Sequence, residues 1–290
     1  MKLAVALRLA RISLLPTVWT NVLAGIALGG GTWADPRLPL LVVALSLFYT
    51  GGMFLNDAFD REFDSRARPE RPIPSGEVTA RAVFSSGFGM IAIGWCALAI
   101  IGQKLSGTPT WAPAVGGLCL AGAIVLYDAY HKSNPLSPLV MGSCRMLVYM
   151  TAALAIVGSL GTDVVVGAVV LLCYLIGLTY AAKNEHLNRV DHAWPLGFLA
   201  VPLVYGAVRA FDQPLVLLPL AALTVWVWLA VRRLMRRGPG DVPRAVVSLL
   251  AGISLLDAMM LAGCGQIVLM LLAGGAFLLT LRLQRWVAGT

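Results

Sequence analysis

The sequence predicts an all-α protein, a polytopic transmembrane helix bundle of nine to ten spans. Of its 290 residues, 59% are hydrophobic and only 12% are charged, whereas a soluble domain carries roughly 25% charged residues. Apolar runs of about 20 residues recur along the chain, and each is long enough to cross a bilayer as a helix. The alternating pattern of a membrane barrel is absent from the sequence. Because backbone groups in lipid must pair internally, helices are the architecture that remains.

Ten apolar segments define the expected helices, and together they form one transmembrane domain over residues 1–290. In chain order the segments are 12–30, 38–57, 82–102, 112–130, 137–159, 162–182, 195–211, 214–231, 245–262 and 265–283. The first follows Arg11, and the second runs without a charge up to Asn56. The fourth ends in the polar stretch YDAYHKSNP, and the fifth and ninth carry Arg145 and Asp257 inside them.

The charges are distributed unevenly among the connections. The net charge is +8, and 18 of the 22 Lys and Arg residues lie in the terminal segments and the even-numbered connections. The odd-numbered connections contain only Arg37, Lys104 and Arg209. Because short cytoplasmic loops are enriched in Lys and Arg, we expect the termini and the polar connections 58–81 and 183–194 in the cytoplasm. The lipid bilayer of the plasma or cell inner membrane is then the surrounding partner. A nucleic-acid partner is excluded, since it would need one basic patch.

A cluster of acid and amide side chains ends the second segment. In NDAFDREFD, Asn56, Asp60 and Asp64 are spaced by four residues, and Asp57 lies three before Asp60. These spacings stack the side chains on one face of a helix. Like charges repel there, and a carboxylate near the hydrocarbon is costly. A divalent cation offsets both penalties, because Mg²⁺ binds one or two carboxylates and shares the oxygens of a phosphate substrate.

The connection that follows supplies the opposite charge. Arg61, Arg66, Arg68 and Arg71 lie just beyond the carboxylates, in a stretch restricted by three prolines. Carboxylate-bound Mg²⁺ next to arginines is a suitable site for a diphosphate. The alternative interpretation is an ordinary helix end, whose solvated charges pair locally.

These motifs resemble the UbiA superfamily of intramembrane prenyltransferases. NDAFDREFD fits the pattern NDxxDxxxD, RARPERPIPSGEVT is similar to the loop that follows it, and LPTVWTNVLAG is similar to the start of the members. The resemblance implies a mainly nine-helix bundle and a Mg²⁺-dependent transfer of an isoprenyl group from an allylic diphosphate to a small, aromatic or lipid-like acceptor. It also implies that Asp57, Asp60 and Asp64 are catalytic and bind the metal, with Asn56 beside them on the substrate.

The resemblance further suggests which basic residues bind the diphosphate. Arg68, Arg71 and Lys132 are expected to neutralise the charge of the departing group. Tyr127 and Lys132 resemble a Tyr-x-x-x-Lys stretch that ends the fourth helix in many members, although the spacing here is one residue longer. Asp128 lies four residues before Lys132 and belongs to the expected substrate-binding set.

A second acidic motif of the superfamily is degenerate in this sequence. Members typically have DxxYAxxDxxxD near the sixth helix, and here the stretch reads GLTYAAKNEHLNRVD, with Gly177, Asn184 and Asn188 in place of aspartates. We expect Lys183, Asn184, Glu185 and Asn188 to form a weaker second wall of the site, with no more than one firmly held Mg²⁺. Ordinary polar loop residues are the alternative. Together with HKSNPLSPLVMGSCR, this stretch resembles the EboC branch of the superfamily.

Three polar residues lie inside apolar segments. Arg145 is too deep in the fifth segment to reach the interface easily, so we expect it to face a polar cavity. There it would contact the diphosphate or an acid of the first cluster; the alternative is a structural ion pair. Asp257 is expected to form hydrogen bonds between helices rather than to take part in catalysis, and Asn21 joins the substrate-binding set. We assign no role to His131 or His186.

The leading hypothesis is therefore a Mg²⁺-dependent prenyltransferase. The alternative is a non-catalytic UbiA-like membrane protein, which would bind an isoprenoid or a pathway intermediate for the assembly or export of a metabolite. The degenerate second motif favours that alternative. A phosphotransferase of the CDP-alcohol type is excluded, because the sequence contains no DGxxAR segment.

Overall fold

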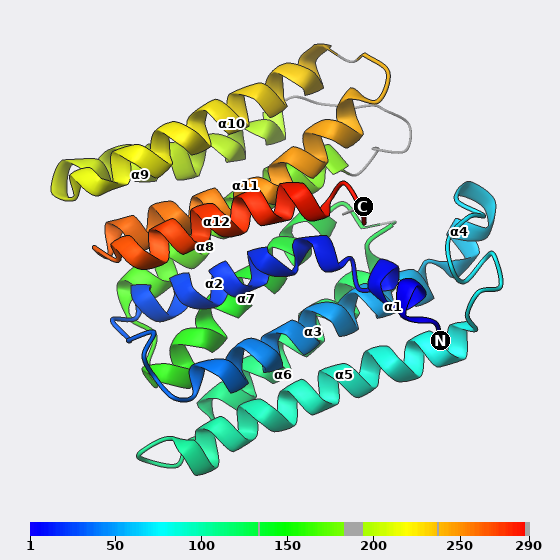
Figure 1. Cartoon of the computed structure of the whole chain (residues 1–290), viewed down its shortest axis with the longest axis horizontal. Coiled ribbons are helices and arrows are strands. Elements are labelled where there is room, and N and C mark those ends of the chain that lie inside the picture. Colours follow the sequence, from blue (N-terminus) through cyan, green and yellow to red (C-terminus); the bar gives the residue numbers. More distant parts are fainter. Residues whose placement is uncertain (133, 183–193, 237, 288–290) are drawn as a thin grey trace.

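The computed structural model describes residues 1–132, 134–182, 194–236 and 238–287, and every regular element in them is a helix (Figure 1). The α-helices are α1 (Leu3–Leu9), α2 (Leu15–Leu28), α3 (Leu38–Phe59), α4 (Arg61–Ala67), α5 (Ala80–Ile100), α6 (Ala112–Tyr130), α7 (Ser137–Ile156), α8 (Thr162–Ala182), α9 (Val201–Asp212), α10 (Leu217–Arg236), α11 (Asp241–Gly263) and α12 (Ile267–Leu283). Shorter 3-10 or π-helical turns are η1 (Ile12–Leu14), η2 (Ile101–Leu105), η4 (Trp194–Ala200) and η5 (Pro214–Val216). The predicted all-α fold is confirmed.

The number of membrane spans agrees with the lower end of the prediction. Among the described residues, eight helices are long and apolar enough to cross a bilayer, and the helices on either side of Arg11 bring the number to nine if they count as one span. Those two helices, α1 and η1–α2, meet at an angle of 54°. The tenth apolar segment forms α12, which has 17 residues and is too short to be counted among these eight helices.

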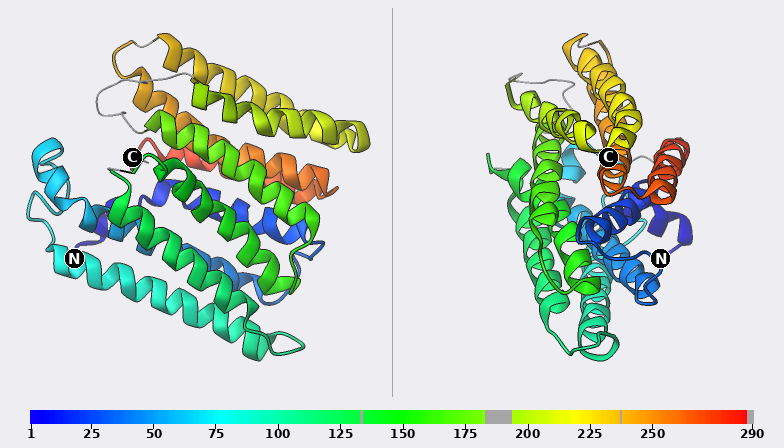
Figure 2. Two further views of the ribbon diagram at one scale, coloured as in Figure 1. Left: turned by 180° about the vertical axis from the view of Figure 1, so that it is seen from behind. Right: turned by 90° about the vertical axis from the view of Figure 1, so that its left-hand side faces the viewer.

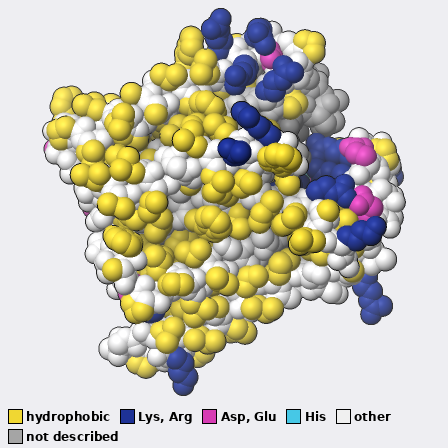
Figure 3. Space-filling view, in the orientation of Figure 1, with side chains coloured by type: hydrophobic (Ala, Val, Ile, Leu, Met, Phe, Trp, Pro, Cys, Tyr) yellow, Lys and Arg dark blue, Asp and Glu magenta, His cyan; other side chains and the backbone are white. Residues whose placement is uncertain are grey.

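The bundle is packed around α11. The membrane-spanning window of α11 is 83% buried, the largest share among the spans, and α11 packs against α2, α8, α10 and α12. Helices α9 and α10 lie on one side of the molecule and α3, α5 and α6 on the other (Figures 1 and 2). Large apolar side chains cover the face in Figure 3, whereas Lys and Arg gather mainly toward one end. This surface is suited to lipid along its sides and to water at its charged end.

Helices α2 and α7 approach each other closely near the centre of the bundle. A Cβ atom at Gly25 of α2 would lie 2.5 Å from the carbonyl oxygen of Tyr149 on α7. Only glycine permits this approach without a shift of the backbone. The contact brings Asn21, one turn earlier on α2, into hydrogen-bond distance of Arg145 on α7.

One end of the bundle collects the polar groups. Helix α3 ends at Phe59, Asp60 joins it to the short α4, and the following loop leads to α5 (Figure 1). The end of α6 lies beside this junction, because Lys132 contacts Asp60. The predicted polar connection 58–81 thus begins as a helix. Of the connection 183–194, residues 183–193 lie outside the described residues.

Candidate active site

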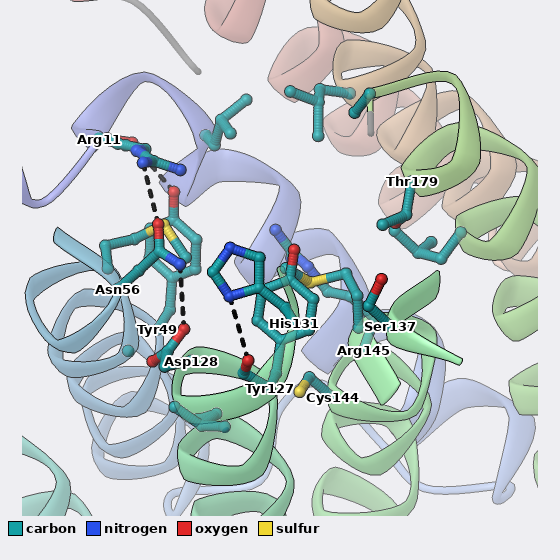
Figure 4. Close-up of a pocket in the computed structure, with 18 of the residues that line it drawn as sticks. Arg11, Tyr49, Asn56, Tyr127, Asp128, His131, Ser137, Cys144, Arg145 and Thr179 are labelled. Carbon is teal, nitrogen blue, oxygen red and sulfur yellow. Dashed lines mark hydrogen bonds between the residues drawn. The ribbon is translucent and has the colours of Figure 1, made fainter. Parts of the chain in front are cut away.

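A cavity of about 410 Å³ opens among α2, α3, α6, α7, α8 and α11. Most of its polar lining comes from one end of the bundle. It includes Arg11, Asn56, Tyr127, Asp128 and His131 (Figure 4), together with Asp60, Arg68, Arg71 and Lys132. Its apolar lining includes Leu45, Phe48, Leu120, Ile124, Val148 and Leu250. An apolar chamber with a charged opening suits a ligand that has a hydrocarbon tail and an anionic head.

Two groups of polar side chains lie in the lining of this cavity or are linked to it by hydrogen bonds; Asp57 and Asp64 are outside the lining and contact Arg71, which belongs to it. We call the first the mouth cluster: Arg11, Asn56, Asp57, Asp60, Asp64, Arg71, Asp128, His131 and Lys132. We call the second the floor network: Thr20, Asn21, Arg145, Tyr149 and Asp257. The mouth cluster comes from the ends of helices and the loop after α4, whereas the floor network joins the interiors of α2, α7 and α11.

The acidic side chains of the mouth share one face, as the sequence predicts. The backbone N–H of Asp60 donates to the carbonyl of Asn56 (2.9 Å), and the N–H of Asp64 donates to that of Asp60 (2.8 Å). The spacing of four residues therefore survives the junction between α3 and α4. Asn56, Asp57, Asp60 and Asp64 are each at most 9% exposed, which is at odds with a helix end whose charges are solvated.

Two arginines contact these acids from different parts of the chain. Nη1 of Arg71 donates to Oδ1 of Asp57 (3.1 Å) and to Oδ2 of Asp64 (3.0 Å). Nη2 of Arg11 donates to Oδ1 of Asn56 and to Oδ1 of Asp57, both at 3.2 Å. Arg71 was predicted from the sequence, and Arg11 was not.

The backbone at Arg11 explains how that guanidinium reaches the mouth. Arg11 has φ 41° and is the only described residue other than glycine with a positive φ. Such a conformation is uncommon for a residue with a long side chain and is often found at functional sites. It occurs where the chain bends between α1 and η1. Charge counting in the sequence locates Arg11 at a helix end but gives no sign that it meets the acids.

The end of α6 closes the mouth from the opposite side. Nζ of Lys132 lies 3.1 Å from Oδ1 of Asp60, and Nε2 of His131 lies 3.6 Å from Oδ2 of the same residue. Asn56 donates through Nδ2 to Oδ1 of Asp128 (3.1 Å), and the rings of Tyr127 and His131 stack with centroids 4.8 Å apart (Figure 4). The structure therefore brings His131 into the cavity lining, a position that the sequence does not predict.

The three predicted metal ligands contact cationic side chains in this structure. Among the described residues, no group of three His, Cys, Asp or Glu side chains is arranged to hold a metal ion. The carboxylate oxygens of Asp57, Asp60 and Asp64 nevertheless fit a divalent cation. Oxygens of Asp57 and Asp64 lie within 3.1 Å of one nitrogen of Arg71, and Oδ1 of Asp64 and Oδ2 of Asp128 are buried without a hydrogen-bond partner in the described residues. Buried carboxylate oxygens of this kind call for a cation or a water molecule.

The pKa shifts at the mouth also favour a bound cation. Burial raises the pKa of the Asp64 carboxyl above its ordinary value, and the neighbouring Asp60 and Asp57 raise it further, while Arg71 opposes them. Burial also lowers the pKa of Arg71. A carboxylate that is crowded by other acids and resists ionisation favours an additional positive charge beside it.

The second wall is described only in part. Lys183, Asn184, Glu185 and Asn188 lie outside the described residues, so their roles stay predictions. Gly177 is described, and a Cβ atom there would lie 2.8 Å from Cγ of Leu199 in η4. The packing of α8 against η4 thus leaves no room for a longer side chain at the position where the superfamily motif begins with an aspartate.

The floor network connects three helices through Asp257. Nδ2 of Asn21 donates to Oδ1 (3.0 Å) and to Oδ2 (2.8 Å) of Asp257. The hydroxyls of Thr20 and Tyr149 also donate to this carboxylate. These bonds agree with the expected helix-to-helix role of Asp257. Asn21 itself is fully buried and outside the cavity lining, so it reaches the cavity only through its neighbour Arg145.

Arg145 is the member of the floor network that lines the cavity. Its Nη1 donates to Oδ1 of Asn21 (2.9 Å), and its Cζ lies 5.4 Å from the centroid of the Tyr49 ring. Among the described residues, Arg145 forms no ion pair with an acid of the mouth cluster. The predicted contact with such an acid is therefore absent, and its link to Asp257 runs through an amide.

This fold and this cavity define an integral membrane protein whose helix bundle encloses an apolar cavity with a charged opening. The sequence model of the UbiA prenyltransferase family matches residues 15–288, and the chain belongs to that family. The superfamily resemblance is thereby confirmed, while the assignment to the EboC branch stays a prediction.

Curated relatives match over part of their length. The digeranylgeranylglyceryl phosphate synthase of Methanopyrus kandleri is 29% identical over 193 residues, which are 63% of this chain and 64% of the relative. The chloroplastic chlorophyll synthase of Arabidopsis thaliana is 27% identical over 209 residues, 67% of this chain and 51% of the relative. The matched region thus spans less than two thirds of either relative.

Solved structures share the fold over most of the chain. A UbiA homologue from Aeropyrum pernix K1 aligns with a TM-score of 0.66 at 14% identity, covering 87% of this chain and 96% of its own. A UbiA homologue from Archaeoglobus fulgidus, whose structure is bound to GPP and Mg²⁺, aligns with a TM-score of 0.54 at 13% identity, covering 91% and 99%. At these identities the likeness shows the architecture.

Proposed function

We propose that this protein is a Mg²⁺-dependent intramembrane prenyltransferase, which moves an isoprenyl group from an allylic diphosphate to a small acceptor. The observation that carries the proposal is the mouth cluster, where four buried acid and amide side chains meet arginine and lysine, with Asn56 and Asp60 lining the opening of an apolar cavity. Membership of the family supports it, as do the GPP and Mg²⁺ bound to the Archaeoglobus homologue.

The acids of the mouth would hold the metal. Asp57, Asp60 and Asp64, with the amide oxygen of Asn56, provide the oxygen ligands that Mg²⁺ prefers. When bound, Mg²⁺ neutralises diphosphate oxygens and makes the diphosphate a better leaving group. Arg11 and Arg71 already contact these carboxylates, so a bound diphosphate would find cations and acids in one place.

The basic residues would stabilise the leaving group. When the allylic C–O bond breaks, its electron pair stays with the diphosphate oxygen, and negative charge grows there. Arg68, Arg71, Arg11 and Lys132 surround the opening and are placed to stabilise that charge. The acceptor then forms a bond with the allylic carbon and loses a proton.

The apolar lining would bind the tail and protect the intermediate. Side chains such as Phe48, Leu120 and Ile124 line the cavity beyond the mouth, and they offer no nucleophile to an allylic cation. They also limit the access of water, which would otherwise capture the cation. We place the mouth, the connections 58–81 and 183–194 and both termini in the cytoplasm, with the single domain 1–290 in the plasma or cell inner membrane, because Lys and Arg favour that side.

The test is the release of pyrophosphate by the purified protein in detergent, with Mg²⁺, a panel of allylic diphosphates and a panel of small acceptors. Asp60→Asn should lower the rate about 100-fold or more, since it removes a charge from the site of leaving-group departure. Glu62→Gln is the matched control, because Glu62 follows on α4 with a side chain 81% exposed. Equal rates for the wild type and Asp60→Asn would overturn the enzymatic proposal.

A non-catalytic binding protein is the second candidate, and the loss of the aspartate at Gly177 favours it. Such a protein would bind allylic diphosphates through the same mouth without releasing pyrophosphate. Binding without release over the whole panel would therefore select this candidate.

A further inference from the structure

The ends of α10, α11 and α12 carry a group of arginines that the mouth cluster does not use. We call this group the arginine rim: Arg233 on α10, Arg244 on α11, and Arg282 and Arg285 at the end of α12. Arg233 is half-buried, and the other three are exposed. Lys and Arg side chains follow the ends of these helices on the face in Figure 3, with apolar side chains farther along the same helices.

Hydrogen bonds to one turn of α11 bring the rim arginines of α10 and α11 together. Nη1 of Arg233 donates to Oγ of Ser248 (3.1 Å). The same hydroxyl donates to the carbonyl of Arg244 (2.8 Å), which lies four residues earlier on the same face of the helix. The two guanidinium groups therefore extend from one patch of surface.

The end of α12 reaches the same turn. Nε2 of Gln284 donates to the carbonyl of Val247 (3.2 Å). Arg282 and Arg285 flank Gln284 in the sequence, and their spacing of three residues favours one side of the chain. Arginines from three helices thus meet at one place on the charged end of the bundle.

No acid of these helices is left to pair with the rim. Asp241 and Asp257 are the only acids between residues 217 and 287. Asp241 accepts two hydrogen bonds from Arg236, and Asp257 is fully buried in the floor network. Within the described residues, no member of the rim forms an ion pair. Neighbouring guanidinium groups repel one another, so a bound anion would stabilise this arrangement.

The arginines on the opposite side of the bundle behave differently. Arg8 pairs with Glu77, and Arg11 and Arg71 pair with acids of the mouth cluster. The positive charge of these residues is therefore balanced within the chain, whereas the rim relies on an anion from outside it.

The surface below the rim is aromatic and apolar. Trp226 of α10 donates through Nε1 to the carbonyl of Ser248 (2.7 Å), and its ring meets that of Phe277 on α12 edge to face, with centroids 4.8 Å apart. On α12, Leu278 and Leu279 are 64% and 42% exposed. Guanidinium groups above an apolar wall suit a ligand that has an anionic head and hydrocarbon chains.

We propose that the arginine rim binds the headgroup of an anionic phospholipid, whose acyl chains lie along the exposed side of α12. Guanidinium groups bind phosphate oxygens through parallel hydrogen bonds. The site does not depend on the proposed prenyl transfer. The bound lipid holds the ends of α10 and α12 against α11, whose opposite face lines the cavity through Val246 and Leu250.

The test measures lipid binding to the purified full chain in a neutral detergent by native mass spectrometry. Dioleoylphosphatidylglycerol and dioleoylphosphatidylcholine are the probes, because they share their acyl chains and differ in the charge of the headgroup. The wild type should bind the anionic lipid about tenfold more tightly. Soluble sn-glycerol 3-phosphate, which has the phosphate without the chains, should not displace it at an equal concentration.

The variant Arg244→Gln/Arg282→Gln removes two exposed cations of the rim. It should lower the affinity for dioleoylphosphatidylglycerol at least fivefold, which corresponds to about 1 kcal/mol, and leave the affinity for dioleoylphosphatidylcholine within about twofold. Arg81→Gln is the matched control, since Arg81 is an exposed arginine of α5 on the other side of the bundle (Figure 1). It should keep the preference of the wild type.

Three results would overturn the inference. The first is equal affinity of the wild type for the two lipids, as expected if acids elsewhere in the chain already neutralise the rim. The second is a preference that survives in the double variant or falls equally in Arg81→Gln, and the third is displacement of the lipid by sn-glycerol 3-phosphate. Inorganic pyrophosphate with Mg²⁺ should bind the double variant and the wild type alike. If pyrophosphate binds neither but the lipid preference holds, the phospholipid site stands and the prenyl transfer falls.

Discussion

The mouth cluster and the floor network both bury charge, but they do so differently. In the mouth, Asp57, Asp60 and Asp64 each have an oxygen within 3.2 Å of an arginine or lysine nitrogen. In the floor, Arg145 and Asp257 are separated by the amide of Asn21. Direct ion pairs can exchange partners when a cation and an anionic head arrive together, because every charge keeps a counterion. The hydrogen bonds through the amide of Asn21 instead hold Arg145 and Asp257 in a single geometry.

The two regions also differ in how the sequence encodes them. The residues of the mouth cluster lie in two stretches of the sequence, 56–71 and 127–132, except for Arg11, which tertiary packing brings to them. The floor takes side chains from the interiors of three helices that are far apart in sequence. This contrast predicts that a single substitution can disable one region and leave the other working.

The largest effect should follow from Arg71→Met. It removes one cation from two buried carboxylates, those of Asp57 and Asp64, and breaking a buried pair from one side costs about 3–5 kcal/mol. Because the freed carboxylates can accept a metal, added Mg²⁺ should raise the unfolding temperature of this variant more than that of the wild type. Thermal unfolding in detergent, with and without Mg²⁺, measures both effects.

The matched control for this variant is Arg66→Met, since Arg66 is an exposed residue of α4. It should change the unfolding temperature little and add no response to Mg²⁺. If Arg71→Met behaves like this control, the mouth cluster does not depend on direct ion pairs. The contrast between the mouth cluster and the floor network then fails.

An intermediate effect should follow from Asn21→Leu. The substitution leaves donors of Arg145 and oxygens of Asp257 without their partner, and an unsatisfied buried group costs about 1–3 kcal/mol. The unfolding temperature should fall while the affinity for pyrophosphate with Mg²⁺ stays, because the mouth is not touched. Ser143→Ala removes an exposed hydroxyl of α7 and should change neither the unfolding temperature nor this affinity. A loss of pyrophosphate binding in Asn21→Leu would mean that the two regions act as one.

The smallest effect concerns pH. The pKa of Asp64 in the folded protein lies above its ordinary value of 3.8, so the folded state binds this proton more tightly than the unfolded state. Its contribution to stability therefore falls as pH rises from 3.8 through the raised folded value. Asp64→Asn should remove this part of the decline, whereas Glu70→Gln, at an exposed acid of the neighbouring loop, should not. Parallel curves of unfolding temperature against pH for all three proteins would contradict the crowding of carboxylates at the mouth.

The sequence predicted most of the mouth because its information is local. A spacing of four residues survives even the junction of α3 and α4, so Asn56, Asp60 and Asp64 share a face in the structure as they do on an ideal helix. All ten apolar segments are helical for the same reason: their length and composition are properties of consecutive residues.

The remaining parts depend on tertiary packing, which one sequence does not display. Arg11 reaches the mouth through a left-handed backbone at a bend, and His131 reaches it because α6 ends beside Asp60. The floor depends on the close approach of α2 and α7 at Gly25. Asn21 and Arg145 were singled out as polar residues in apolar segments, but their contact with each other could not be read from spacing.

The central claim is that the mouth cluster binds a metal-bridged diphosphate. The most direct measurement is the dissociation constant of an unreactive thiolo analogue of geranyl diphosphate, with Mg²⁺ and with a chelator, for the wild type, Asp60→Asn and Glu62→Gln. We predict that Mg²⁺ tightens binding about tenfold or more in the wild type and Glu62→Gln, and that Asp60→Asn loses this dependence. An affinity indifferent to Mg²⁺ in the wild type, or an unchanged dependence in Asp60→Asn, would contradict the claim.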